Sequence, residues 1–191
     1  MFRAVGLAAK ERGLSPEKTE DISSLCREIS LELISGEEGV KVFLNGREVT
    51  NLLRTPEMDK WSSAVALIPG VRACLLERQR AYGREGGVVA EGRDMGSVVF
   101  PNADLKFFLT ASAEIRARRR YEELSKKGIN LSYEEVLTQL LERDRRDQER
   151  DTAPLIVPEG AVVIDTSDLS LEEVLERMHS EVKRILKSLA Q

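Results

Sequence analysis

Two groups of charged residues in the second half of the chain have the types and spacing of a binding site for a phosphorylated ligand. Arg93 and Asp94 follow the short apolar segment 87–91. In open α/β sheets, ligands bind beyond the carboxyl ends of the strands. There Arg93 could bind a phosphate and Asp94 could accept a hydrogen bond from a substrate. The other interpretation is a surface ion pair in a glycine-rich turn.

The second group is a charged run near the end of a predicted helix. Arg143, Asp147 and Arg150 are spaced i, i+4 and i+7, so they share one helix face and could point into a cleft. Asp144 and Gln148 continue the neighbouring row equally well. Such a run is usually an exposed helix face stabilised by weak ion pairs, so both interpretations stay open.

A third group of arginines occupies positions 116, 118, 119 and 120. Some will be surface charges, but near a phosphate site they could neutralise a transferring phosphoryl group. We expect no metal site, because His179 is the only histidine and Cys26 and Cys74 form no Cys-x-x-Cys motif. The same count makes a disulfide framework implausible, and the two cysteines are predicted to be buried thiols.

The elements that must position these groups follow from the periodicity of apolar residues. Buried strands are expected at 87–91, 105–109 and 161–165, and helices at 112–126, 132–150 and after Ser170. Capping boxes are predicted at Ser132 with Glu135 and at Ser170 with Glu173. Strands that alternate with helices indicate a parallel sheet flanked by helices, and hence the α/β class.

The first half is predicted to be mainly helical around a small antiparallel segment. Helices are expected from Phe2 to Gly13 without an N-terminal cap, from Pro16 to Glu28 after a Ser15 cap, and on both sides of Pro69 between 56 and 83. The alternating pattern from 30 to 50 contains Asn45-Gly46, a strong hairpin signal.

The composition excludes several classes of protein. With 29 Lys and Arg against 33 Asp and Glu, the net charge is −4, which does not favour a general affinity for nucleic acid or anionic membranes. A hydrophobic content of 41% is typical of a folded domain and not of a disordered chain. The sequence shows neither a membrane span nor a signal peptide, so we expect a cytoplasmic protein.

Specific motifs in the chain resemble those of bacterial cytidylate kinase. The segment from Arg93 to Ala103, preceded by Glu91-Gly92, resembles the family signature. The similarity extends through 71–80 and 142–155 and covers essentially the whole chain. The hairpin at 30–50 is similar to the enlarged nucleotide-binding insert of this bacterial type.

The resemblance implies one nucleoside monophosphate kinase-like domain over 1–191, with the insert at 30–50 and a lid at 116–130. Its fold would be a P-loop kinase-like parallel sheet flanked by helices. The implied reaction transfers the terminal phosphoryl group of ATP, with Mg²⁺, to CMP or dCMP. The implied protein is a monomer without nucleic-acid or membrane partners. The lid residues would be Arg116, Arg119 and Arg120.

The resemblance also implies roles for single residues in the acceptor site. Arg3 and Arg93 would hold the acceptor phosphate. Ser63, Arg72 and Asp94 would read the cytosine.

A second set of residues would act on the ribose and the phosphates. Asp147 would accept a hydrogen bond from the ribose hydroxyl. Arg143 and Arg150 would contact nucleotide phosphates and, with Arg93, form the catalytic set.

One departure from the family pattern concerns ATP. The family carries a Gly-x-x-x-x-Gly-Lys-Ser/Thr loop, and no glycine of this sequence is followed by lysine. We therefore expect an N-terminally truncated chain that lacks the first strand and the P-loop and is inactive as written. The alternatives are a noncatalytic pyrimidine-nucleotide-binding module or pseudokinase, and a helical interaction protein whose charged helices are only surface.

Overall fold

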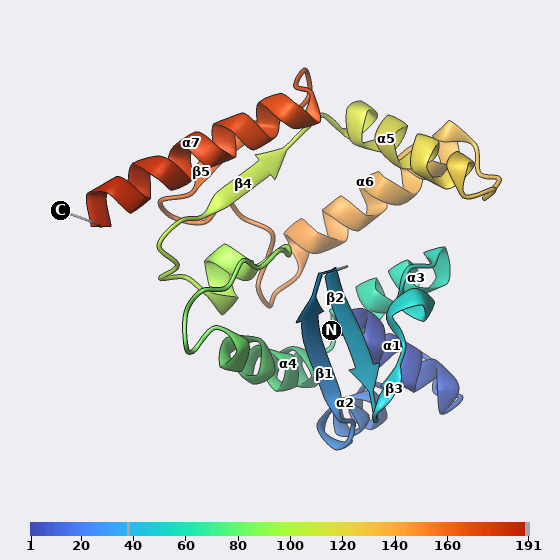
Figure 1. Cartoon of the computed structure of the whole chain (residues 1–191). Coiled ribbons are helices and arrows are strands. Elements are labelled where there is room, and N and C mark those ends of the chain that lie inside the picture. The colour runs from blue at the N-terminus through green and yellow to red at the C-terminus, as the bar shows by residue number, and fades with distance from the viewer. Residues whose placement is uncertain (38, 190–191) are drawn as a thin grey trace. The chain divides into compact units, whose positions relative to one another are not determined.

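The computed structural model describes residues 1–37 and 39–189. The chain divides into two compact units, Met1–Val88 and Val89–Gln191 (Figure 1). The single domain that the sequence predicts over 1–191, with its insert at 30–50 and lid at 116–130, stays a prediction.

The first unit is built on two packed pairs of helices. α1 (Phe2–Glu11) packs on α3 (Pro56–Val65), and α2 (Thr19–Glu28) packs on α4 (Pro69–Tyr82). Their apolar faces form a core that includes Val5, Ile22, Leu25, Val71 and Leu75, all of them 0–1% exposed. The predicted break at Pro69 is confirmed, because proline begins α4 where its missing N–H costs nothing.

The beginning of α2 differs from the prediction. Ser15 and Pro16 do not cap and open the helix; they belong to a turn in which Lys18 N donates to Ser15 O at 3.0 Å. α2 begins at Thr19, and its N-cap residue Lys18 makes no side-chain cap. The carbonyl oxygen of Ser15 thus accepts a hydrogen bond within this turn and does not begin the hydrogen-bond pattern of a helix that starts at Pro16.

A three-stranded antiparallel sheet completes the first unit. β1 (Leu31–Gly36) pairs with β2 (Gly39–Leu44), which pairs with β3 (Arg47–Glu48); a short 3₁₀ helix, η1 (Thr50–Leu53), follows. Asn45 and Gly46 have φ values of 49° and 77°, as a type I′ hairpin turn requires, so this predicted turn is confirmed.

The described part of the second unit contains a small parallel sheet, three α-helices and a short π-helical segment. β4 (Phe107–Thr110) pairs in parallel with β5 (Val162–Asp165), and α5 (Ala113–Lys126) lies beside α6 (Tyr133–Glu149) (Figure 1). The last helix, α7 (Leu171–Leu189), follows β5. The α/β class and both predicted capping boxes are confirmed.

The strand predicted at 87–91 is wrong. These residues pair with no strand among the described residues, and Val89 is fully exposed. Gly86 and Gly87 both have positive φ values, which place a tight turn where the strand should begin. A strand forms only by pairing with a neighbour, and the partner that the described residues give to β4 is β5.

The burial of the two observed strands also differs from the prediction. Leu109 of β4 and Val163 of β5 are 50% and 54% exposed. The described residues therefore leave part of this parallel sheet uncovered, although parallel strands are usually covered on both faces.

Candidate functional site

The centre of the candidate site is Asp147 on α6, which faces three arginines. Its carboxylate lies 3.5 Å from Arg93 Nε, 3.6 Å from Arg150 Nη1 and 3.9 Å from Arg143 Nε. The helix periodicity of α6 brings Arg143, Asp147 and Arg150 together, as their i, i+4 and i+7 spacing suggests. The structure thus shows a cluster of charged side chains on this face, and the predicted cleft stays a prediction.

A second carboxylate, Asp144, lies one helix row away and joins the same cluster. Its Oδ2 accepts a hydrogen bond from Arg116 Nη1 at 2.5 Å, and its Oδ1 lies 3.8 Å from Arg93 Nη2. Arg116 is held in turn, because its Nε donates to Ala111 O at 2.9 Å. Asp144 therefore links α5 to the segment that carries Arg93.

Local backbone structure holds Arg93 and Arg150 in place. Asp94 O accepts hydrogen bonds from both Val98 N and Val99 N, which begins the π-turn η2 (Met95–Val99) immediately after Arg93. π-turns of this kind often occur at functional sites. At the end of α6, Arg150 Nε donates to Ala153 O at 2.6 Å, and the Arg150 side chain is only 6% exposed.

The cluster carries an excess of positive charge. Four guanidinium groups (Arg93, Arg116, Arg143 and Arg150) face two carboxylates. Burial lowers the pKa of Arg93 from its ordinary value, and the nearby Arg143 lowers it further, while Asp147 and Asp144 oppose the shift. An anion that entered the cluster would relieve this repulsion.

Several polar atoms of the cluster are buried without a hydrogen bond among the described residues. They are Arg143 Nε, Asp144 Oδ1 and Asp147 Oδ2, together with Ser97 Oγ. Buried polar groups in folded proteins are nearly always hydrogen-bonded to protein, water or a ligand. The ion pairs of Asp147 are long, and these atoms lack hydrogen-bond partners among the described residues. The cluster therefore has polar atoms left to bind water or a ligand.

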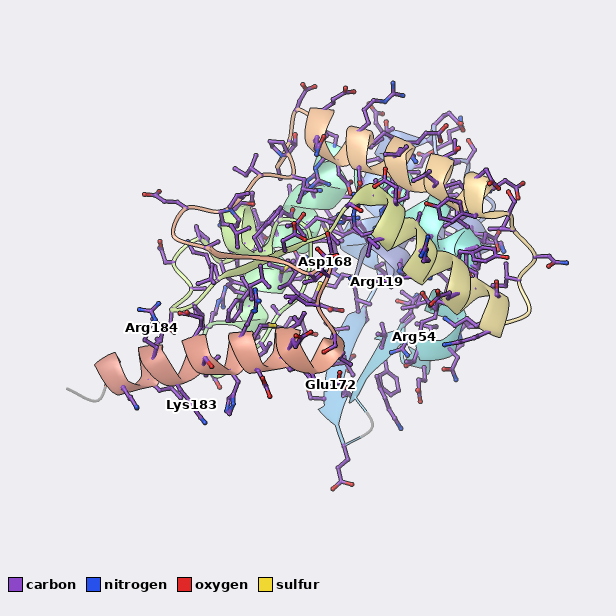
Figure 2. All side chains as sticks on the ribbon, turned by 90° about the horizontal axis from the view of Figure 1, so that it is seen from above. Arg54, Arg119, Asp168, Glu172, Lys183 and Arg184 are labelled. Atoms are coloured by element: carbon purple, nitrogen blue, oxygen red, sulfur yellow. The ribbon has the colours of Figure 1, made fainter. Side chains whose placement is uncertain are left out.

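The three predicted lid arginines have different partners. Arg116 belongs to the cluster. Arg119 extends from α5 toward the loop that carries Asp168 (Figure 2) and donates to Thr166 Oγ1 at 3.0 Å and to Thr166 O at 2.6 Å. Arg120 pairs with Glu123 on its own helix. Arg119 therefore ties α5 to the end of β5 in this structure.

The remaining predicted site residues lie in the first unit. Arg3 donates to Leu53 O at 2.7 Å and pairs with Asp59. Arg72 is buried, its guanidinium carbon lies 5.5 Å from the centre of the Phe2 ring, and its Nη1 donates to Ala66 O at 3.2 Å.

Ser63 on α3 is partly buried in the same unit, whereas Asp94, 6% exposed, belongs to the second unit. The structure thus brings Arg93, Arg143, Asp147 and Arg150 together, and places Arg3, Ser63 and Arg72 in the other unit.

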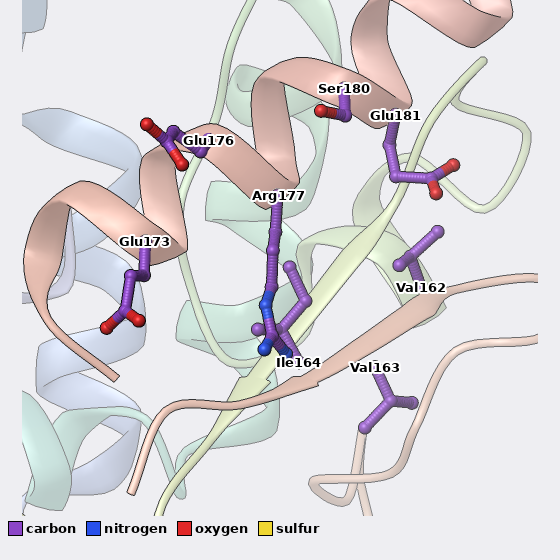
Figure 3. A pocket seen from close by; sticks show the side chains of 8 residues that line it. All are labelled: Val162, Val163, Ile164, Glu173, Glu176, Arg177, Ser180 and Glu181. Atoms are coloured by element: carbon purple, nitrogen blue, oxygen red, sulfur yellow. The ribbon is translucent and has the colours of Figure 1, made fainter. Parts of the chain in front are cut away.

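A separate cavity in the second unit lies away from this cluster. A cavity of about 540 Å³ between β5 and α7 is lined by Val162, Val163, Ile164, Glu173, Glu176, Arg177, Ser180 and Glu181 (Figure 3). Three glutamates and one arginine make this lining net negative, so it is unsuited to a phosphate. None of the predicted site residues lines it.

Asp144 is the residue of the cluster that sequence reasoning did not select. The helical spacing of the sequence places Asp144 on the face beside that of Asp147. This spacing alone does not show that Arg93 and Arg116 approach Asp144. The pairing depends on how α5 and the segment before η2 pack on α6.

Among the described residues, no group of three or more His, Cys, Asp or Glu side chains could hold a metal ion. No described helix combines the length and the apolar character needed to cross a membrane.

Comparison with known proteins points to one family. The cytidylate kinase family model matches residues 1–184. The cytidylate kinase of Geobacter sp. (strain M21) is 45% identical over 97% of this chain and 80% of its own. The cytidylate kinases of Caldanaerobacter subterraneus subsp. tengcongensis and Carboxydothermus hydrogenoformans are 45% and 46% identical, over 96% and 93% of this chain and 80% of each relative.

Proposed function

Because the chain belongs to the cytidylate kinase family, we propose that it takes part in the transfer of the terminal phosphoryl group of ATP to CMP or dCMP, which yields ADP and CDP or dCDP. The observation that carries the proposal is the cluster of arginines around Asp147. Phosphoryl transfer needs positioned groups and neutralised charge more than covalent help from the protein, and arginine supplies both.

The cluster is proposed to receive the phosphate of the acceptor nucleotide. A phosphate monoester carries about two negative charges at neutral pH, which matches the excess of two guanidinium groups over carboxylates. Arg93 is 39% exposed and only loosely paired, at 3.5 Å or more, so it can turn from the aspartates to the phosphate. Arg143 and Arg150 would then neutralise the negative charge of the phosphoryl group during its transfer between the nucleotides.

The ribose and the base would be bound by further groups. Asp147, whose Oδ2 accepts no hydrogen bond among the described residues, would accept one from the ribose hydroxyl. Asp94, with Ser63 and Arg72, would bind the cytosine edge, and Arg3 would assist with the acceptor phosphate. A carboxylate suits the amino group of cytosine, which donates hydrogen bonds.

The donor side of the reaction is proposed from the family alone. ATP would be the phosphoryl donor, and Mg²⁺ would accompany its phosphates. The described residues do not fit a resident Mg²⁺, because Asp144 and Asp147 face arginines and no third ligand is grouped with them.

The segment 116–130 is proposed to act as a lid over the nucleotides. Arg116, Arg119 and Arg120 lie on α5, and Arg116 already reaches the cluster through Asp144. Lid closure would add the charge of Arg116 to the transferring phosphoryl group. We also propose that the protein is a monomer, acts in the cytoplasm and does not bind nucleic acid.

The function is tested by nucleotide binding and turnover measured on the same preparation. CMP and dCMP should bind to the 191-residue chain, and AMP should not. No ADP should form, because the sequence contains no Gly-Lys pair to cradle ATP. A fusion that adds a Gly-x-x-x-x-Gly-Lys-Ser/Thr segment from a cytidylate kinase relative should phosphorylate CMP.

Two outcomes would contradict the proposal. Equal binding of AMP and CMP would refute the proposed substrate class. CMP binding without turnover in the fusion would favour a noncatalytic pyrimidine-nucleotide-binding module.

A further inference from the structure

The two cysteines of the first unit lie against each other. Cys26 on α2 and Cys74 on α4 are both free thiols, and their Sγ atoms are 2.8 Å apart. Cys74 Sγ also donates to Cys26 O at 3.2 Å. The sequence predicted two buried thiols, which is confirmed for Cys26 but not for Cys74, and nothing in their spacing shows that α2 packs on α4.

We propose that Cys26 and Cys74 are a reactive thiol pair, which a small-molecule disulfide such as oxidised glutathione converts into an intramolecular disulfide between α2 and α4. A disulfide bond is about 2.0 Å long, so the two sulfurs need to approach by less than about 1 Å. Helices that are already packed together can supply such a movement through the cysteine side chains. The site is distinct from the nucleotide site and does not rest on the proposed function.

The burial of the two thiols sets the order of the reaction. Cys26 is 0% exposed, whereas Cys74 is partly exposed and can meet a dissolved reagent. The Cys74 thiolate attacks one sulfur of oxidised glutathione, which forms a mixed disulfide and releases one glutathione thiolate. That thiolate takes up a proton from water.

The second step closes the bond within the protein. Cys26 loses its proton to solvent, and its thiolate attacks the Cys74 sulfur of the mixed disulfide. The protein disulfide forms and the second glutathione leaves as a thiolate. Two cysteine thiols are thereby oxidised, and one molecule of oxidised glutathione is reduced to two of glutathione.

The surroundings of Cys26 make the second step slow at neutral pH. Burial, together with the neighbouring Cys74, raises the pKa of Cys26 to about 12, while Arg78 and Arg27 act in the opposite direction. Arg78 is close, since its Nη2 donates to Cys26 O at 3.0 Å. Because the thiolate is the attacking species, closure should accelerate about tenfold for each unit by which the pH rises, as long as the pH stays below this pKa.

The test is intact-mass spectrometry of the folded 191-residue chain after treatment with oxidised glutathione. The wild type should lose two hydrogens, keep no glutathione and resist alkylation after unfolding in the absence of a reductant. Cys26→Ser should stop at a glutathione adduct on Cys74. Cys74→Ser should stay unmodified while folded, because its remaining thiol is buried.

A stable glutathione adduct on the wild type would overturn the proposal. So would a wild type that keeps two free thiols under conditions that fully modify Cys26→Ser. Faster modification of Cys74→Ser than of the wild type would do the same. Cys26→Ala replaces Cys26→Ser if circular dichroism shows that the serine variant is unfolded. The oxidised wild type should also melt at a higher temperature than the reduced form, since the bond closes a long loop.

Discussion

Arg116 Nη1 donates a hydrogen bond to Asp144 Oδ2 at 2.5 Å and thereby joins α5 to α6. The other oxygen of the same carboxylate faces Arg93 at 3.8 Å. Asp144 is only 14% exposed, so water screens these interactions weakly. One carboxylate thus holds an arginine of the proposed lid and an arginine of the proposed phosphate site.

Asp144→Asn should destabilise the second unit and weaken CMP binding. Removing the charge leaves Arg116 and Arg93 with a neutral acceptor, and a hydrogen bond to a charged group is worth about 1.5–3 kcal/mol. Denaturant unfolding and calorimetric titration of CMP measure the two effects. The control is Glu142→Gln on the exposed face of α6, which should change stability by less than about 0.5 kcal/mol. Equal values for both variants would show that Asp144 positions nothing.

Asp94→Ala should weaken the binding of CMP by about 1–3 kcal/mol, because a buried partner of the base would be lost. Ribose 5-phosphate lacks the base, so its affinity should not change. Calorimetric titration of both ligands into both proteins makes the comparison. If the two ligands lost affinity equally, Asp94 would act on the phosphate or on the fold.

Local sequence signals predicted the helices well and the sheet partly. The capping box of Ser132 with Glu135 and the helix break at Pro69 each involve residues that are close in sequence. Such features can therefore be predicted from a short stretch of the chain. The segment 87–91 is different, because a strand requires a partner that local sequence does not reveal. The same limit applies to tertiary contacts such as those of Asp144.

The site could be predicted only in part for the same reason. Helical spacing placed Arg143, Asp147 and Arg150 on one face, which the structure shows. It could not show that Arg93 meets them, nor that Cys26 meets Cys74. Those contacts depend on how separate helices and segments pack together. The spacing of residues along the chain does not reveal this packing.

Gly6→Ala should destabilise the first unit by about 1–3 kcal/mol through overpacking. A Cβ at Gly6 would lie 2.7 Å from Trp61 Cβ, where α1 crosses α3, so the helices would have to separate. Thermal and denaturant unfolding measure the loss. Gly36→Ala is the matched control, because among the described residues its Cβ would meet only Gly39 O, at 3.8 Å. An unchanged midpoint for Gly6→Ala would refute the close packing.

The N-terminus of α7 should lose stability in acid. Hydrogen bonds from the backbone N–H and hydroxyl of Ser170 lower the pKa of Glu173 below its ordinary value of 4.5. The stabilisation is therefore present above about pH 4.5 and is lost as the pH falls through the lower folded-state pKa. Amide exchange at residues 171–175 between pH 7 and pH 3 measures the effect. Glu173→Gln should remove the pH dependence, and a variant that kept it would assign the effect to another group.

The account depends most on the claim that the arginine cluster binds the phosphate of CMP. Isothermal titration of the 191-residue chain with CMP and with cytidine tests it, using Arg93→Gln as the variant. We predict that CMP binds at least about tenfold more tightly than cytidine and that Arg93→Gln removes most of this difference, since charge-assisted bonds of about 1.5–3 kcal/mol are lost. Equal affinities for CMP and cytidine, or an unchanged preference in Arg93→Gln, would contradict the account.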